Sequence, residues 1–128
     1  MNTEQRVATH YTHGSLLQAI LDALKQMGKD PERLTAMDLS TGDEFHLGAL
    51  PVTAALAKDL GLASGMHVLD VGCGIGGPAR YFADAHKCRV TGIDLTEEFV
   101  QVAAELTRRC GMADLVAFRH FTRCFSRR

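Results

Sequence analysis

The chain has 128 residues, of which 46% are apolar and 23% charged, with 14 basic and 15 acidic side chains. That length predicts one domain with a true core, because chains divide into several domains only beyond about 250 residues. The net charge of −1 gives no electrostatic footprint for nucleic acid, and no apolar run reaches the roughly 20 residues of a membrane span. We therefore expect neither nucleic-acid binding nor a membrane span.

The cysteines are dispersed at positions 73, 88, 110 and 124, without a CxxC pair. This pattern favours free thiols over a zinc site or a disulfide scaffold, and the N-terminus does not resemble a secretory signal. We therefore expect a cytoplasmic protein without a bound metal. His10 and His13 form an HxxH pattern, but no third ligand is near, so two surface histidines are the simpler interpretation.

Residues 1–65 are predicted to be an N-terminal helical segment. Apolar residues recur at helical spacing from Ser15 to Met27, and Gly28 supplies a stop. Residues 29–45 mix Pro, Gly, Ser, Thr and acidic residues, and predict a connection. A second helix is expected to begin near Pro51 and to end at Gly61.

From Met66 onwards, short β-rich runs alternate with helical patterns. Strands are predicted at 66–71, 88–93 and 115–118, and helices at 78–85 and 96–110. Thr96 is the expected N-cap of the second of these helices. The stripe expected to be buried on that helix consists of Phe99, Val102, Ala103, Leu106 and Cys110. The alternation predicts an α/β fold with parallel strands and helices packed on the sheet.

The segment VLDVGCGIGG (68–77) joins the first predicted strand to the first predicted helix of this region. Gly72, Gly74 and Gly76 leave the backbone bare, so that a ligand can approach the main chain. Asp94 lies 17 residues beyond Gly77, at the end of the second strand, where a carboxylate can accept both hydroxyl hydrogens of a ribose. Purely structural roles are also open: Asp70 could be a turn-former, and Asp94 could cap the helix that follows it.

Two ligands fit this arrangement. Gly72, Gly74 and Gly77 satisfy the G-x-G-x-x-G pattern of dinucleotide sites, which alone is a weak signal. Asp70 lies two residues before the first glycine, where its charge would repel a pyrophosphate but attract a sulfonium and an ammonium group. The pattern therefore favours S-adenosylmethionine over a nicotinamide dinucleotide.

The stretches DEFHLGALPVTAALAKDLGL, VLDVGCGIGGPARYFA and RVTGIDLTEEFVQVAAELTRRCGM resemble the class I S-adenosylmethionine-dependent methyltransferases. Within them, the chain is most similar to the small-molecule group with quinone-ring and glycine/sarcosine methyltransferases. The resemblance implies that Asp70, Gly72 and Gly74 line the methionine part of the cofactor. It also implies that Asp94 holds the ribose and that Leu95 packs on the adenine. Tyr11 is a weaker match to an aromatic residue covering the cofactor. The predicted cofactor-binding residues are Asp70, Gly72, Cys73, Gly74, Gly76, Asp94 and Leu95.

The resemblance implies a seven-strand sheet, of which residues 66–128 would supply an incomplete Rossmann-like part with three strands. After about Arg119 the sequence HFTR (120–123) departs from the family pattern, which suggests a truncated or frame-shifted product. We therefore expect methyl transfer to a small-molecule acceptor as the family function, but little activity from this chain alone. No catalytic residue can be assigned, and an unpaired sheet edge favours self-association. A dinucleotide-binding oxidoreductase fragment and a non-catalytic partner subunit are the alternatives.

Overall fold

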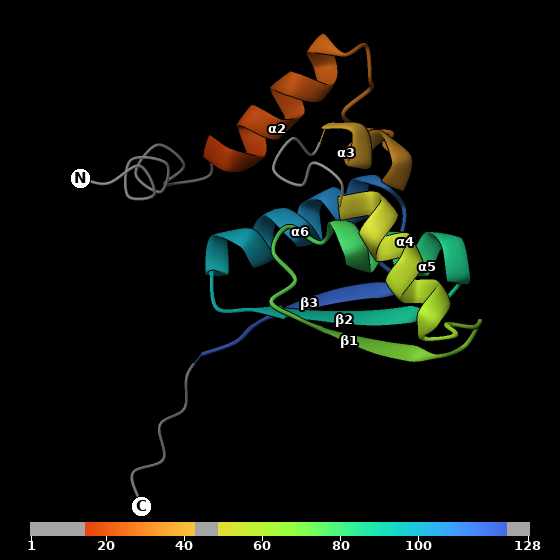
Figure 1. Cartoon of the computed structure of the whole chain (residues 1–128). Coiled ribbons are helices and arrows are strands. Elements are labelled where there is room, and N and C mark those ends of the chain that lie inside the picture. Colours follow the sequence, from red (N-terminus) through yellow and green to blue (C-terminus); the bar gives the residue numbers. More distant parts are fainter. Residues whose placement is uncertain (1–14, 43–48, 123–128) are drawn as a thin grey trace, which may run out of the picture.

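The computed structural model describes residues 15–42 and 49–122, so His10, Tyr11 and His13 lie outside the described residues. Five helices and three strands follow one another in this part of the chain, as Figure 1 shows. They are α2 (Ser15–Gln26), α3 (Ala36–Gly42), α4 (Ala49–Asp59), β1 (His67–Val71), α5 (Gly77–His86), β2 (Arg89–Asp94), α6 (Glu97–Arg109) and β3 (Val116–His120).

The three strands form a parallel sheet in the order β1-β2-β3, which confirms the α/β prediction. The register places Leu69 of β1 beside Thr91 of β2, and Thr91 beside Ala117 of β3. Helices α5 and α6 lie over the same side of the sheet (Figure 1). On the other side, the β1 residues Leu69 and Val71 are 61% and 72% exposed. Within the described residues the sheet is therefore covered on one face only.

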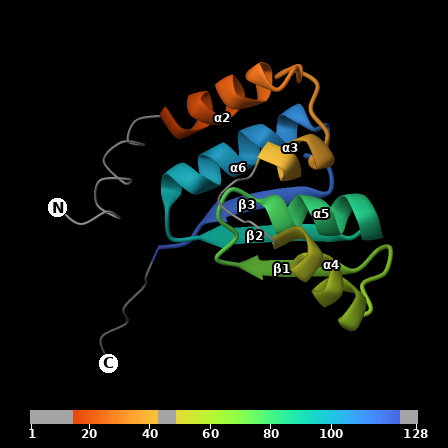
Figure 2. The same cartoon turned by 45° about the horizontal axis from the view of Figure 1, so that its top comes forward.

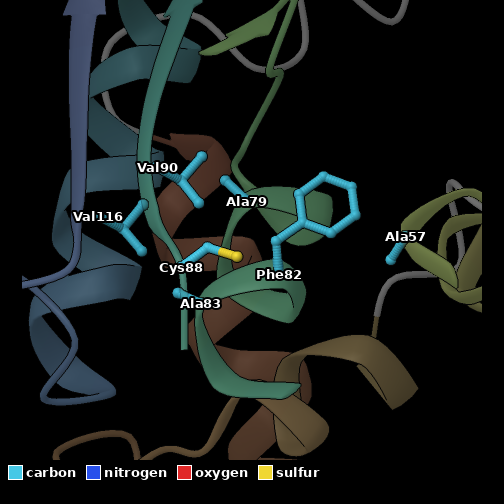
Figure 3. Packing of buried hydrophobic residues seen from close by; sticks show 7 residues of the cluster. All are labelled: Ala57, Ala79, Phe82, Ala83, Cys88, Val90 and Val116. Carbon is cyan, nitrogen blue, oxygen red and sulfur yellow. The ribbon is translucent and has the colours of Figure 1, made fainter. Parts of the chain in front are cut away.

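A first hydrophobic cluster fixes α5 over the sheet. Figure 3 shows side chains of α5 facing residues of β2 and β3, with Ala57 contributed by α4. Pro78 occupies the first turn of α5, where its missing N–H costs no helical hydrogen bond. The start of α5, and with it the loop that precedes the helix, is therefore held close to the sheet. The cluster consists of Ala57, Ala79, Phe82, Ala83, Cys88, Val90 and Val116.

A second cluster joins the N-terminal helices to α6, beside which α2 runs in Figure 2. Leu24 of α2 and Leu106 of α6 are fully buried in it. Burial of such a side chain contributes about 1.5–3 kcal/mol relative to leaving it exposed. The helical part before β1 therefore packs on the same helix that follows Asp94. The cluster consists of Leu16, Leu24, Leu34, Leu39, Val102 and Leu106.

One helix was not predicted. Residues 29–45 were expected to form a connection, but α3 (Ala36–Gly42) lies within them. The Thr35 hydroxyl accepts the Asp38 N–H at 3.1 Å, and the Asp38 carboxylate accepts the Thr35 N–H at 3.0 Å. This reciprocal capping box satisfies backbone donors at the helix start. The sequence TAMD (35–38) carried that signal.

Three details of the later elements also differ from expectation. Phe99, expected in the buried stripe of α6, is 37% exposed, whereas Val100 and Thr107 are buried. Thr96 is the N-cap residue, but its hydroxyl makes no capping hydrogen bond. Strand β3 continues to His120 instead of ending at residue 118. The positions of Phe99, Val100 and Thr107 show that the buried face of α6 is rotated from the predicted one. The reason is that α6 contacts both the sheet and the N-terminal helices.

Within residues 15–42 and 49–122, no helix combines the length and apolar character needed to cross a bilayer. The same part of the chain contains no group of three or more side chains that could hold a metal ion. The division into a helical segment (1–65) and an incomplete sheet domain (66–128) stays a prediction.

Candidate functional site

The glycine loop connects β1 to α5 at the carboxyl end of the sheet, where β2 also ends (Figure 1). The backbone N–H groups of Gly72 and Cys73 both donate to the Ile93 carbonyl, at 2.8 and 3.0 Å. These two hydrogen bonds attach the start of the loop to Ile93, the next-to-last residue of the neighbouring strand β2. The carboxyl ends of parallel strands are where such sheets bind their ligands.

Asp94 holds the middle of the loop. Its Oδ2 atom accepts the Gly74 N–H at 2.9 Å, and its Oδ1 atom accepts the Thr96 N–H at 2.8 Å. The carboxylate therefore serves the start of α6 as well as the loop. An ionised carboxylate has about four acceptor positions, so two remain for hydroxyl groups of a ligand.

Asp70 is the second carboxylate of the site. It lies in β1 opposite Gly92 of β2, and its Oδ2 atom is buried. This atom has no hydrogen-bond partner within the part of the chain that the structure describes. Burial, and secondarily the negative charge of Asp94, raise the pKa of Asp70. A buried acceptor without a donor costs free energy, and a cationic donor placed here would remove that cost.

The three loop glycines differ in their surroundings. Gly72 and Gly74 have φ angles of +74° and +55°, and a Cβ atom on either would meet nothing within 4 Å. Gly76 has a φ of +87°, and its Cβ atom would lie 2.5 Å from Cζ of Phe118. Gly72 and Gly74 therefore border open space that a ligand can enter. Gly76 instead permits close packing of the loop on β3.

Two further predicted residues lie beside the carboxylates. The Cys73 side chain is buried, and burial, together with Asp70 and Asp94, raises the pKa of its thiol to about 11. The thiol is thus protonated at neutral pH, and contact with a ligand would come from the Cys73 backbone. Leu95 follows Asp94 and exposes its side chain, while its carbonyl lies 3.0 Å from Nε2 of His120.

Sequence reasoning missed three residues that support the loop from beneath. A Cβ atom on Gly92 would lie 2.7 Å from Cδ1 of Phe118 and 2.8 Å from Cβ of Cys73. A glycine inside a strand is a known sign of such close approach. Arg80 is buried in α5, and its Nη1 atom donates to the Ile75 carbonyl at 2.8 Å. No sequence signal predicts a buried arginine at that position.

The comparison with known proteins agrees with this geometry. Residues 68–122 match a family model described as a methyltransferase domain. The fold is similar to that of an S-adenosylmethionine-dependent methyltransferase from Thiobacillus denitrificans, crystallised with S-adenosylhomocysteine. That similarity has a TM-score of 0.50 and 36% sequence identity, and covers 54% of this chain and 28% of the other. Residues 68–122 are thus similar in sequence to a methyltransferase domain, and the chain is similar in fold to an S-adenosylmethionine-dependent methyltransferase.

Curated methyltransferases are also similar to this chain. A sterol 24-C-methyltransferase of Eremothecium gossypii is 37% identical over 78 residues, which are 61% of this chain and 21% of that enzyme. A phosphoethanolamine N-methyltransferase of Arabidopsis thaliana is 39% identical over 71 residues, 56% of this chain and 14% of that enzyme. The matched methyltransferase segment thus spans about a fifth or less of the length of these relatives.

Proposed function

We propose that this methyltransferase segment binds S-adenosylmethionine at the loop Gly72–Gly76, between Asp70 and Asp94. The observation that carries the proposal is the buried Asp70 oxygen without a donor among the described residues, two positions before Gly72, where the backbone borders open space. An ammonium group entering that space would supply the missing donor and would offset the carboxylate charge. The residues present therefore fit the cofactor that the fold family implies.

The other predicted residues take complementary parts in the proposal. The two remaining acceptor positions of Asp94 suit the adjacent hydroxyl groups of a ribose. The exposed side chain of Leu95 offers an apolar surface to an adenine ring. Cys73 and Gly76 would act through the backbone of the loop. When bound, S-adenosylmethionine supplies an already activated methyl group, so the task of the protein is to position it and to exclude water.

The hydrogen bonds of the loop favour this cofactor over a dinucleotide. The amides of Gly72 and Cys73 donate to Ile93, that of Gly74 to Asp94, and that of Gly76 to the Cys73 carbonyl. Four amides that could cradle a pyrophosphate are therefore already engaged within the protein. The Asp70 carboxylate adds repulsion toward phosphate charge.

We further propose that the complete reaction is methyl transfer to a small-molecule acceptor. The relatives are named for sterols and phosphoethanolamine, two acceptors of very different polarity. The matched segment spans a small share of those enzymes, and none of the described residues is assigned as a catalytic base. We therefore expect this chain by itself to bind the cofactor and to transfer methyl groups slowly or not at all.

Titration calorimetry with S-adenosylhomocysteine, S-adenosylmethionine and NAD tests the cofactor proposal. We expect heat from the first two ligands and none from NAD. Asp94→Asn should weaken binding of S-adenosylhomocysteine, whereas Asp84→Asn, an exposed change on α5, should leave it unchanged. Binding of NAD without binding of S-adenosylhomocysteine would instead favour the oxidoreductase interpretation.

The uncovered face of the sheet supports a separate proposal about association. Parallel sheets are normally covered on both faces, and Leu69 and Val71 expose large apolar side chains here. We propose that this chain self-associates through this face and the β1 edge. We also propose a cytoplasmic location, because the dispersed cysteines favour a reducing compartment. Sedimentation velocity should show mass increasing with concentration, and Leu69→Lys should reduce the increase. A monomer at all concentrations would contradict the proposal.

A further inference from the structure

Arg80 is a buried cation beneath the glycine loop. Only 2% of its surface is exposed, although it is one of the longest side chains in the molecule. Its Nη1 atom donates to the Ile75 carbonyl at 2.8 Å and to the Thr107 hydroxyl of α6 at 3.3 Å. The Nη1 atom carries two N–H groups, so this one nitrogen joins the loop, α5 and α6.

The bond to Ile75 complements the bond from Asp94. Asp94 fixes the Gly74 N–H from the side of β2, and Arg80 fixes the carbonyl of the next residue from the side of α5. Two consecutive residues of the loop are therefore held from opposite sides by charged groups. Such charge-assisted hydrogen bonds are stronger than bonds between neutral groups.

The packing around Gly76 leaves Arg80 little freedom. A Cβ atom on Gly76 would lie 2.8 Å from the Arg80 Nη1 atom, so the guanidinium fits closely against the bare backbone. Phe118 of β3 lies against the same Cβ position, with its Cζ atom at 2.5 Å. The guanidinium therefore fills the space under the loop while it bonds to Ile75.

We propose that Arg80 is a positioning residue for the cofactor site, which holds the Ile75 carbonyl and thereby keeps Gly72 and Gly74 open to the ligand. The effect of Arg80 on ligand binding rests on the proposed function, that the loop binds S-adenosylmethionine. The structural part of the inference, the ordering of the loop, is testable in the protein without ligand. A lysine carries the same charge on a compact ammonium group instead of a planar guanidinium, so it would not place its donors at the position of Nη1.

Arg109 provides a matched control at the far side of α6. It is also largely buried, and its Nη1 atom also donates to a backbone carbonyl at 2.8 Å, that of Pro31. Arg109→Lys therefore makes the same substitution away from the loop, at a guanidinium that also pairs with Glu32 and Glu105. Arg80→Lys and Arg80→Gln are the test variants, so that one remains if the other does not fold.

Amide hydrogen exchange followed by NMR, and titration with S-adenosylhomocysteine, give the two readouts. In the Arg80 variants we expect exchange at Gly74 to accelerate about tenfold relative to amides of β2, with a comparable loss of affinity per folded molecule. Arg109→Lys should change neither ratio. Unchanged relative exchange at Gly74 in a folded Arg80 variant would overturn the inference. If the unmodified chain does not bind S-adenosylhomocysteine, the proposed function fails, and the exchange data still decide the role of Arg80 in ordering the loop.

Discussion

The backbone N–H of Gly74 donates to Asp94 Oδ2 over 2.9 Å, although 20 positions separate the two residues in the chain. The bond joins the loop after β1 to the end of β2, and Asp94 also binds the N–H of Thr96 at the start of α6. One carboxylate therefore connects the ends of two strands and the start of a helix. A change at Asp94 should alter the shape of the loop as well as remove a ligand contact.

Asp94→Asn tests this connection. The amide cannot accept at both oxygen positions, and it lacks the charge that strengthens both bonds. Loss of one charge-assisted hydrogen bond costs about 1.5–3 kcal/mol, which corresponds to about ten- to a hundredfold weaker binding of S-adenosylhomocysteine. Calorimetry measures the effect, with Asp84→Asn as the control. Equal affinities of the Asp94 and Asp84 variants would show that the carboxylate does not contribute.

Gly76→Ala, compared with Gly111→Ala, separates the cost of overpacking from the cost of backbone strain. The new Cβ atom would meet Phe118 and Arg80 at a φ of +87°, so overpacking adds to backbone strain, at a cost of about 2–4 kcal/mol. Gly111→Ala, at a φ of +67° with nothing within 4 Å, introduces the strain alone. Thermal unfolding should therefore show a larger loss for Gly76→Ala. Similar losses in both variants would mean that the contact with Phe118 is unimportant.

The sequence was sufficient for the order of the three strands and the two helices between them, and for the meeting of Asp94 with the glycine loop. Apolar periodicity distinguishes strands from helices, and parallel strands place their carboxyl ends at one edge of the sheet. Short α3 was missed because it depends on a capping box between Thr35 and Asp38. The burial of Arg80 was missed because its acceptors, Ile75 and Thr107, come from a loop and from another helix. Hydrogen bonds between separate segments leave no periodic pattern in the sequence from which they could be predicted.

Glu105 is expected to stabilise the folded state at neutral pH and to lose this contribution in acid. Hydrogen bonds from Arg108, and then from Arg109, lower the pKa of Glu105 to about 2 from an ordinary value of 4.5. Because the folded state lowers this pKa, the stabilisation is complete above about pH 4.5 and disappears as the pH falls toward 2. Glu105→Gln should therefore lower the unfolding temperature at pH 7 and have little effect at pH 2. Glu97→Gln, on the exposed first turn of α6, is the control. A pH-independent difference between wild type and Glu105→Gln would contradict the ion-pair explanation.

The Asp70 carboxylate is expected to lower the stability of the folded chain while it strengthens binding of the ligand. Burial, and secondarily Asp94, raise the pKa of Asp70 above its ordinary 3.8, so the folded chain keeps this proton to a higher pH than the unfolded chain does. Stability therefore decreases as the pH rises from 3.8 to the raised pKa, and the full cost is present above that pKa.

Asp70→Asn removes that cost, and we expect a higher unfolding temperature than wild type at pH 7 and a vanishing difference below pH 3.8. The same variant should bind S-adenosylhomocysteine at least about tenfold more weakly, because the ammonium group loses its ionic acceptor. Asp114→Asn, an exposed change before β3, controls for net charge in both measurements. A variant that gains stability and keeps full affinity would place Asp70 outside the binding site. A variant that loses both would show that the carboxylate supports the fold, since a residue retained for a ligand is expected to cost stability when the ligand is absent.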